Sequence, residues 1–399
     1  MEYSALQLLF SPAGQEALAR ATALQPREPD FLKHFNALSR LYPTDLARAA
    51  LEVAILRQEA AVKFPNAEKM YFTRPALEQA TAFEVATYRV QRFAGQLRLI
   101  DLGCSIGGDT LALAALAPTI GIDLDPLRLG MARANLAACG LAGRADFVLA
   151  DLTQALPLNP PPGTGLFFDP ARRTGEGRVF SVVDYRPPLS TLERWLPHTP
   201  AAGVKVSPGV RLDELKAYPA EIEFISLKGD LKEAVLWFGP LRTAWRRATV
   251  LPGPHSLWAA QEAVNAQAGR PISPPRAYLY EPDPAVLRAG LVQTLGEQLD
   301  AAQLDPDIAY LTADHRIETP FARSWQVEAW FPFSLKRLRH ELRQRGVTQV
   351  VVKKRGSPLQ PEALIRSLRL KDGDRSDHAE RVVFLTHLRG QPVVVLCLP

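Results

Sequence analysis

The stretch LIDLGCSIGGDTLALAALAPTIGIDLD, residues 99–125, contains two short apolar runs that end at Asp101 and Asp123. A glycine-rich turn and a helical pattern, DTLALAALA, separate the two runs. In an open parallel sheet, the order of strand, glycine turn, helix and strand directs backbone N–H groups and the positive end of the helix into one crevice. The stretch therefore predicts a parallel α/β sheet with a site for a nucleotide-like ligand at its carboxyl edge.

Acids end four successive predicted strands, namely Asp101, Asp123, Asp151 in VLADL and Asp169 in FFDP. Ligands of such sheets bind outside the carboxyl ends of the strands, so the four side chains are expected to converge. Asp123 lies about twenty residues beyond Asp101, the spacing at which a carboxylate binds ribose hydroxyls. Helix capping explains any one of these acids, but it is a poor explanation of all four. A dinucleotide-dependent dehydrogenase also has a glycine turn and a ribose acid, but it leaves Asp151 and FFDP unexplained.

Length and composition allow two or three domains in the 399 residues, with 47% hydrophobic and 22% charged side chains. No run approaches the length of about 20 uncharged apolar residues that a membrane helix needs. Three cysteines cannot form a disulfide framework, and the first residues lack a basic stretch before the apolar one. Cytoplasmic location is expected. The seven histidines lack metal-ligand spacing, so no metal is expected.

The pattern along the chain predicts four parts. Residues 1–95 have apolar side chains three and four apart and form a helical module. Residues 96–250 alternate strands and helices, with further strands at 202–206, 221–227 and 233–238, the last two close enough to pair antiparallel. Residues 251–309 are a Pro-rich connector, with 252–284 as a boundary and a helix around 285–299. Residues 310–399 form a small basic α/β domain.

The order Asp-x-Gly, Gly-x-Asp, Ala-Asp-Leu and Asp-Pro resembles the class I S-adenosylmethionine-dependent methyltransferases over roughly residues 97–239. The resemblance implies a Rossmann-like sheet, S-adenosylmethionine as cofactor, and a role for each matching residue. Asp101, Gly103, Cys104 and Gly107 would form the turn around the amino-acid part of the cofactor. Asp123 with Leu124 would contact the ribose, and Asp151 with Leu152 the adenine. From the residues alone, Cys104 is a small side chain suited to a tight turn.

Two flanking segments extend the resemblance. The segment KMYFTRPALEQATAFEVATYRVQRF is similar to the helical lead-in of trimethylguanosine synthase-like RNA methyltransferases, which covers the cofactor. The resemblance implies that Phe72, Thr73 and Thr81 have this role here. The string PFSLKRLRHELRQRGVTQVVVKKRG and the strands after it resemble a THUMP-like domain, related in arrangement to an RNA-binding module. RNA is therefore the expected partner.

The Asp-Pro pair at the end of the fourth predicted strand indicates which kind of substrate is methylated. Enzymes that methylate an exocyclic amine of a base commonly have Asp or Asn, two prolines and an aromatic residue here. This chain has Asp169 and Pro170, the expected catalytic residues, followed by Ala171, Arg172 and Arg173 instead of an aromatic residue. An Arg plane can stack on a base or bind a phosphate, and it can also simply pair with nearby acids. We expect methylation of a base nitrogen, with guanine favoured, in structured RNA.

The last expectation concerns the positively charged residues 335–375, which indicate an anionic partner. Residues 335–375 contain twelve Lys or Arg and four acids, whereas the whole chain has a net charge of +5. Lys353, Lys354 and Arg355 are the expected contacts to an RNA backbone, whose contribution to binding is electrostatic. A solvated helix face is the alternative reading of this charge. A protein or small-molecule methyltransferase and an inactive RNA-binding relative stay open as alternative functions.

Overall fold

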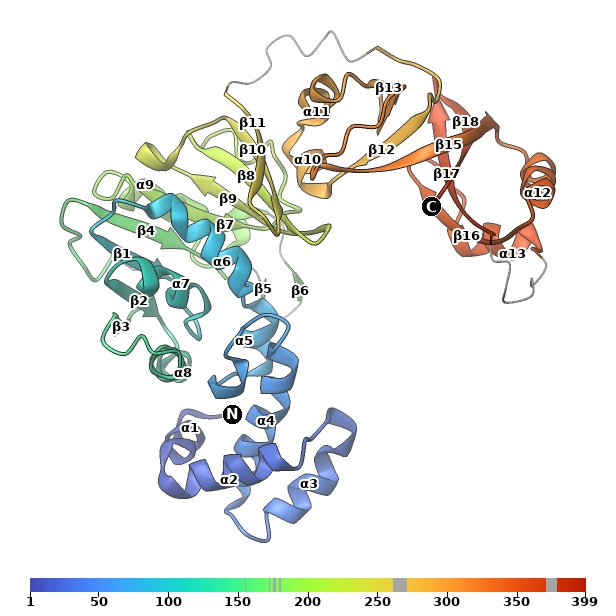
Figure 1. Ribbon diagram of the computed structural model, residues 1–399. Helices are drawn as coiled ribbons and strands as arrows, with labels where there is room; N and C mark the ends of the chain where they lie inside the picture. The colour runs from blue at the N-terminus through green and yellow to red at the C-terminus, as the bar shows by residue number, and fades with distance from the viewer. Residues whose placement is uncertain (155, 172, 175–176, 179–180, 261–270, 371–378) are drawn as a thin grey trace. The chain divides into compact units, whose positions relative to one another are not determined.

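The computed structural model describes residues 1–399 except 155, 172, 175–176, 179–180, 261–270 and 371–378 (Figure 1). Backbone packing divides the chain into two compact units, Met1–Glu221 with Glu233–Thr243 and Ile222–Lys232 with Ala244–Pro399. The division falls within two consecutive strands, β8 (Glu221–Leu227) and β9 (Asp230–Trp237). Among the described residues, no helix combines the length and apolar character needed to cross a membrane.

Helices dominate the start of the first unit. They are α1 (Tyr3–Phe10), α2 (Pro12–Ala23), α3 (Phe31–Leu38), α4 (Thr44–Ala60), α5 (Arg74–Gln79) and α6 (Phe83–Val90). The start of α2 follows from its local sequence, because Ser11 Oγ accepts the backbone N–H of Gly14 at 3.1 Å and Pro12 occupies the first helical position. The core of these helices continues into the elements that follow, since Leu51 and Phe64 share one buried cluster with Ile106 and Met131.

The sheet of the first unit has the strand order β9-β7-β4-β1-β2-β3. Its other strands are β1 (Arg98–Leu102), β2 (Thr119–Asp123), β3 (Ala145–Leu149), β4 (Thr164–Phe168) and β7 (Ala202–Val206). These five run parallel, and β9 runs antiparallel beside β7. The connecting helices are α7 (Gly108–Leu116), α8 (Pro126–Ala138) and α9 (Leu192–Trp195), and the short strands β5 (Arg173–Thr174) and β6 (Gly177–Arg178) pair with each other. Figure 1 shows α7 and α8 beside β1 to β3.

The pairing register aligns the carboxyl ends of the parallel strands. Asp101 lies opposite Gly121 of β2 and Phe167 of β4, so the ends of the three strands meet at one edge. The strands predicted at 202–206 and 221–227 coincide with β7 and β8. The expected α/β class, with a mostly parallel sheet preceded by a helical module, is confirmed.

The second unit contains β8, β10 (Arg246–Leu251), β11 (His255–Ala259) and a seven-stranded sheet of order β13-β14-β12-β15-β18-β17-β16. The strands of this sheet are β12 (Tyr278–Pro282), β13 (Ala302–Asp305), β14 (Ile308–Ala313), β15 (Ala322–Pro332), β16 (Val347–Lys354), β17 (Ala379–Leu388) and β18 (Gln391–Cys397). Its helices are α10 (Pro284–Ala289), α11 (Val292–Gln298), α12 (Leu335–Gln344) and α13 (Pro361–Leu368).

Two local expectations for this unit need correction. The helix predicted around 285–299 is two helices, α10 and α11, which are separated at Gly290, where φ is +71°. The Pro-rich stretch 252–284, expected only as a boundary, contains the strands β11 and β12. Prolines lie near the ends of both strands, so their short apolar runs were not recognised as strands from the sequence.

Candidate functional site

The glycine turn after β1 is tied to the neighbouring strands. Gly103 has φ +79°, and a Cβ on it would lie 2.6 Å from the backbone oxygen of Asp169. The N–H groups of Gly103 and Cys104 both donate to Ile122 O at the end of β2, at 2.8 and 3.1 Å. Gly107, at φ +81°, directly precedes α7. The chain therefore makes the tight turn that the sequence predicts, in close contact with the segment after β4.

Asp101 is buried at the end of β1, with 1% of its surface exposed. Its Oδ2 accepts the Thr110 hydroxyl at 2.5 Å, and its Oδ1 has no hydrogen-bond partner among the described residues. Burial, helped by the nearby Asp109 carboxylate, raises the pKa of Asp101 to about 8. A buried polar atom without a partner is costly, so Oδ1 is the kind of atom that a polar ligand group would satisfy.

Asp123 ends β2 beside the same turn and is 7% exposed. Its two oxygens accept the backbone N–H groups of Ser105, at 2.9 Å, and of Asp125, at 3.0 Å. Burial raises the pKa of Asp123, although the two backbone hydrogen bonds act in the opposite direction. Leu124, the next residue, is 70% exposed. The structure thus places Asp123 against the glycine turn, as the strand topology predicts.

Asp151 lies in a turn of its own beyond β3. It is exposed, and its Oδ1 accepts the backbone N–H and the hydroxyl of Thr153 at 2.9 and 2.7 Å. The hydrogen bond from the Thr153 hydroxyl lowers the pKa of Asp151. Leu152 beside it is buried, and the backbone N–H of Ala150 donates to Asp123 O at 3.1 Å. This contact ties the loop to the end of β2, while the Asp151 carboxylate bonds locally.

Asp169 follows β4 and lies next to the end of β1, because its N–H donates to Leu102 O at 3.0 Å. Its Oδ2 accepts the ammonium of Lys205 at 2.7 Å. Within the described part of the chain, no hydrogen bond to its Oδ1 is found. Pro170 continues the segment, Arg172 lies outside the described residues, and Arg173 begins β5. Asp169 therefore presents one carboxylate oxygen at the edge that also carries Asp101.

Lys205 is a site residue that reasoning from the sequence missed. It lies in the apolar strand β7 and is 3% exposed. Its Nζ donates to Thr81 Oγ1 and to Asp169 Oδ2, each at 2.7 Å. The signal was a single lysine within the run AAGVKV, since a strand buried on both faces is normally apolar throughout. Thr81, expected to cover a cofactor, therefore contacts Lys205.

The lead-in segment before the sheet is held by a buried amide. Asn135 Oδ1 accepts the N–H of Tyr71 at 2.7 Å, and Asn135 Nδ2 donates to Tyr71 O at 3.1 Å and to Ile106 O at 2.9 Å. One side chain of α8 thereby joins the segment before α5 to the glycine turn. Phe72 is fully buried, and Thr73 precedes α5 without capping it through its side chain.

A buried ion cluster holds α6 against the sheet of the first unit. The Arg89 guanidinium pairs with Asp109 of α7 and Glu233 of β9, and all three side chains are at most 11% exposed. The same guanidinium lies 4.1 Å from the ring centroid of Phe167 in β4. The reading of the sequence also missed this cluster, which fixes the helix that follows Thr81.

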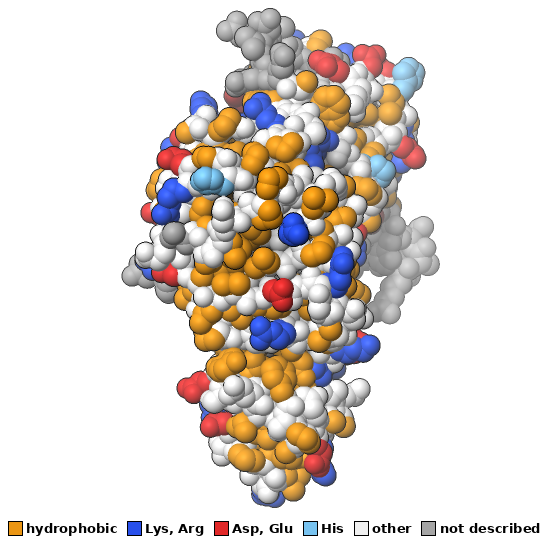
Figure 2. Space-filling view, turned by 90° about the vertical axis from the view of Figure 1, so that its left-hand side faces the viewer, with side chains coloured by type: hydrophobic (Ala, Val, Ile, Leu, Met, Phe, Trp, Pro, Cys, Tyr) orange, Lys and Arg blue, Asp and Glu red, His pale blue; other side chains and the backbone are white. Residues whose placement is uncertain are grey.

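The three basic residues that were expected to contact RNA lie in the second unit and make contacts within the chain. Lys353 pairs with Glu281 and lies 4.9 Å from the ring centroid of Trp325. Arg355 lies 5.3 Å from the ring centroid of Tyr310, and Lys354 is exposed and donates to Gln360 Oε1 at 3.0 Å. The left-hand side of Figure 1, which is the face drawn in Figure 2, carries Lys and Arg side chains dispersed among apolar ones. The three expected RNA contacts therefore have intramolecular partners.

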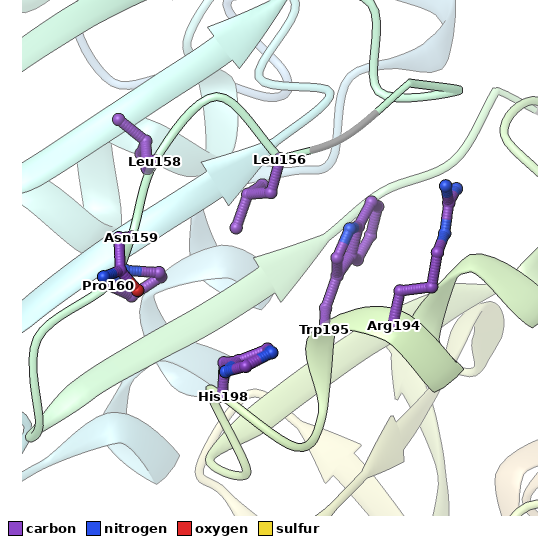
Figure 3. Close-up of a pocket in the computed structure, with 7 residues that line it drawn as sticks. All are labelled: Leu156, Leu158, Asn159, Pro160, Arg194, Trp195 and His198. Atoms are coloured by element: carbon purple, nitrogen blue, oxygen red, sulfur yellow. The ribbon is translucent and has the colours of Figure 1, made fainter.

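A pocket of about 280 Å³ lies between the loop after β3 and the region of α9 (Figure 3). It is lined by Leu156, Leu158, Asn159, Pro160, Arg194, Trp195 and His198, none of which is an expected site residue. Arg194 donates to Thr153 O at 3.4 Å, which links the rim of the pocket to the turn of Asp151. Within the described ranges, no group of three or more His, Cys, Asp and Glu side chains has the arrangement of a metal site.

Comparisons with known proteins agree with this geometry. Residues 322–399 match a family described as THUMP domain-like, and residues 2–60 match a domain of unknown function (DUF8688). The crystal structure of a candidate methyltransferase from Porphyromonas gingivalis W83 has a TM-score of 0.76, with 21% identity, 96% of this chain and 97% of that chain covered. At this identity the likeness concerns the fold.

Relatives with higher identity determine the family. A stretch of 115 residues, 29% of this chain and 24% of the relative, is 30% identical to an uncharacterized RNA methyltransferase of Parasynechococcus marenigrum WH8102. Two uncharacterized S-adenosylmethionine-dependent methyltransferases of Mycobacterium tuberculosis, from strains CDC 1551 / Oshkosh and ATCC 25618 / H37Rv, are each 37% identical over 342 residues, 82% of this chain and 90% of the relative. The chain therefore belongs to the S-adenosylmethionine-dependent methyltransferases, takes its methyl group from that cofactor, and carries a THUMP-like C-terminal domain.

Proposed function

We propose that this methyltransferase acts on a base nitrogen of structured RNA, an exocyclic amine with guanine favoured. The observation that carries the proposal is Asp169, whose carboxylate follows β4 beside the glycine turn and has Oδ1 available within the described part of the chain. A carboxylate oxygen at this position can accept a hydrogen of an amine while the nitrogen lone pair faces the methyl donor.

The residues at the carboxyl edge fit S-adenosylmethionine. Asp101 Oδ1 is a buried acceptor without a partner among the described residues, which suits the ammonium of the amino-acid part. The close approach of Gly103 to its neighbour leaves room for a backbone surface and not for a side chain. Asp123 would bind the ribose, and the segment of Asp151 and Leu152 would border the adenine. When bound, the cofactor supplies an electrophilic methyl group on a sulfonium.

The chain's own residues contribute orientation more than covalent chemistry. Asp169 Oδ1 would hold one hydrogen of the substrate amine, and the backbone carbonyl of Pro170 would be the second acceptor. The buried Phe72 segment, held to the turn by Asn135, would exclude water from the crevice. Alignment of two reactants in this way accounts for a large part of many enzymatic rate enhancements.

RNA is favoured as substrate by the THUMP-like domain and by the similarity to an RNA methyltransferase. The positive charge of residues 335–375 supports an anionic partner. Arg172 and Arg173, which follow the Asp-Pro segment, would stack on the base or bind a phosphate. The closer likeness to trimethylguanosine synthase-like enzymes stays a prediction.

A transfer assay tests the proposal. We expect the full chain to label RNA from a source strain lacking the gene when radioactive S-adenosylmethionine is supplied, and nucleoside mass spectrometry to identify a methylated amine. Asp169→Ala should abolish transfer with little change in cofactor affinity by calorimetry, whereas the control Asp213→Asn, an exposed acid paired with Arg211, should leave both unchanged.

Three other results would contradict parts of this proposal. Labelling of the protein or metabolite fraction instead of RNA would favour the protein or small-molecule alternative, and cofactor binding without transfer to any fraction would favour an inactive RNA-binding protein. Asp123→Ala should weaken cofactor binding by about 1–3 kcal/mol, the cost of losing a charged hydrogen-bond partner. An unchanged affinity would remove Asp123 from the ribose site.

A further inference from the structure

A charged side chain is enclosed in the middle of the sheet of the first unit. Lys205 is 3% exposed, and its neighbours in β7, Val204 and Val206, are fully buried. Burial of an ammonium costs several kcal/mol unless hydrogen bonds and an opposite charge compensate it. A methionine or leucine would fill this position without that cost, so the lysine needs an explanation beyond packing.

Its hydrogen bonds connect three segments that are distant in sequence. Lys205 Nζ donates to Asp169 Oδ2 at 2.7 Å, across 36 residues, and to Thr81 Oγ1 at 2.7 Å, across 124 residues. Thr81 is itself buried and lies between α5 and α6. Among the described residues, Arg89 is a further cation near Asp169, and it pairs with Asp109 and Glu233. The ammonium that pairs with Asp169 is therefore that of Lys205.

The geometry leaves the two oxygens of Asp169 in different situations. Oδ2 is occupied by the ammonium, which fixes the rotation of the carboxylate, while Oδ1 has no partner among the described residues. The side chain of Asp169 is 22% exposed, so part of the carboxylate is accessible. A carboxylate held in this manner offers one acceptor in one direction, as a preorganised site requires.

We propose that Lys205 is a positioning residue for methyl transfer, which holds Asp169 so that Oδ1 alone receives a hydrogen of the substrate nitrogen. The inference rests on the proposed role of Asp169.

Kinetics of three variants test the proposal. With RNA from the strain lacking the gene, we expect Lys205→Met to lower kcat by about 10- to 100-fold, the range for an unpaired charged hydrogen-bond partner. KM for S-adenosylmethionine should change less than about twofold, because the proposed cofactor contacts are at the glycine turn, Asp123 and the Asp151 segment and do not include Lys205. Lys205→Arg retains the charge and should recover at least part of kcat, and Lys216→Met, an exposed lysine outside the site, should match the wild type.

A merely structural lysine gives a different result. Lys205→Met with wild-type kcat would overturn the proposal, as would equal losses of kcat and of cofactor affinity in both the Met and the Arg variants. Thermal unfolding of each variant separates these outcomes from loss of the fold.

A spectroscopic measurement tests the pair without a substrate. In the full chain labelled with ¹⁵N-lysine, we expect a slowly exchanging ammonium signal that disappears in Lys205→Arg and shifts in Asp169→Asn. An ammonium signal that Asp169→Asn leaves unchanged would overturn the proposal. Failure of the wild type to methylate RNA would instead contradict the proposed function, and the signal would still decide whether Lys205 holds Asp169.

Discussion

Two groups of charged side chains, one in each unit, differ in how deeply they are buried. In the first, Arg89 and Lys205 are buried and pair with acids from other elements. In the second, Arg345 after α12 and Lys353 in β16 are about one quarter exposed, and Arg345 pairs with Glu341 one helical turn away. Buried charges must have fixed partners because desolvation is costly, whereas exposed ones can exchange a partner for water. We therefore expect charge changes to have large effects in the buried group and small ones in the partly exposed group.

The largest expected effect comes from breaking the buried cluster. Arg89→Met leaves Asp109 and Glu233 without their cation, and we expect a loss of about 3–5 kcal/mol in the free energy of unfolding. The matched change Arg345→Met removes two partly exposed ion pairs, with Glu341 and with Glu328, and it should cost about 0–1 kcal/mol. Chemical denaturation of both variants measures the difference, and similar losses would contradict the contrast between the units.

The second prediction concerns pH. Burial raises the pKa of Asp101 from 3.8 to about 8, with Asp109 and Asp169 adding to the shift and Arg89 opposing it. Folding therefore favours the protonated form, so this contribution to stability is fully present below about pH 4 and is lost as the pH rises towards 8. Asp101→Asn should remove that dependence, giving the variant an advantage of a few kcal/mol near pH 8 and little at pH 4. Denaturation of the cofactor-free chain across this range measures it, and parallel curves would show that Asp101 is ionised throughout.

A third pair of variants compares two glycines with left-handed backbone. A Cβ at Gly103 would lie 2.6 Å from Asp169 O, whereas a Cβ at Gly346, after α12, would meet nothing within 4 Å. Gly346→Ala should cost about 1–2 kcal/mol from backbone strain alone. Gly103→Ala should cost about 2 kcal/mol more, because the clash is with backbone, and should also weaken cofactor binding. Equal losses of stability would show that the turn adjusts to the added methyl group.

The smallest effect is expected in the basic segment. Neutralising Lys353, Lys354 and Arg355 to Gln should flatten the dependence of log RNA affinity on log salt by about one unit, because only Lys354 is exposed and outside an ion pair or ring contact. A salt titration with bulk RNA measures the slope. A change of about three units would mean that RNA displaces Glu281, and no change would remove the segment from the RNA site. Cofactor binding serves as the control.

The sequence predicted that Asp101 and Asp123 lie at one edge of the sheet because topology fixes the positions of strand ends. Asp101 and Asp123 end parallel strands whose ends must meet at one edge, and the spacing between them already indicated a nucleotide-like ligand. The bounds of β7 and β8 were predictable for a similar reason, since both are short apolar runs between turn residues.

The contacts of individual side chains were not predictable in this way. Lys205 bonds with Thr81 across 124 residues, and Lys353 pairs with Glu281 across 72 residues. The local sequence does not indicate which distant residue a long, flexible side chain will contact, because the partner depends on packing between elements. The strands β11 and β12 escaped prediction because prolines and polar residues surround their short runs.

Asn135 has a consequence for the order in which the chain is made. Its amide bonds Tyr71, which leaves the ribosome 64 residues earlier. At about 5–20 residues per second, the Tyr71 segment exists for several seconds without its partner. The core of the N-terminal helices is equally incomplete during that interval, since Met131 and Leu136 belong to the same cluster. The nascent helices therefore expose apolar surface until α8 is synthesised, and this is the interval in which a chaperone would bind them.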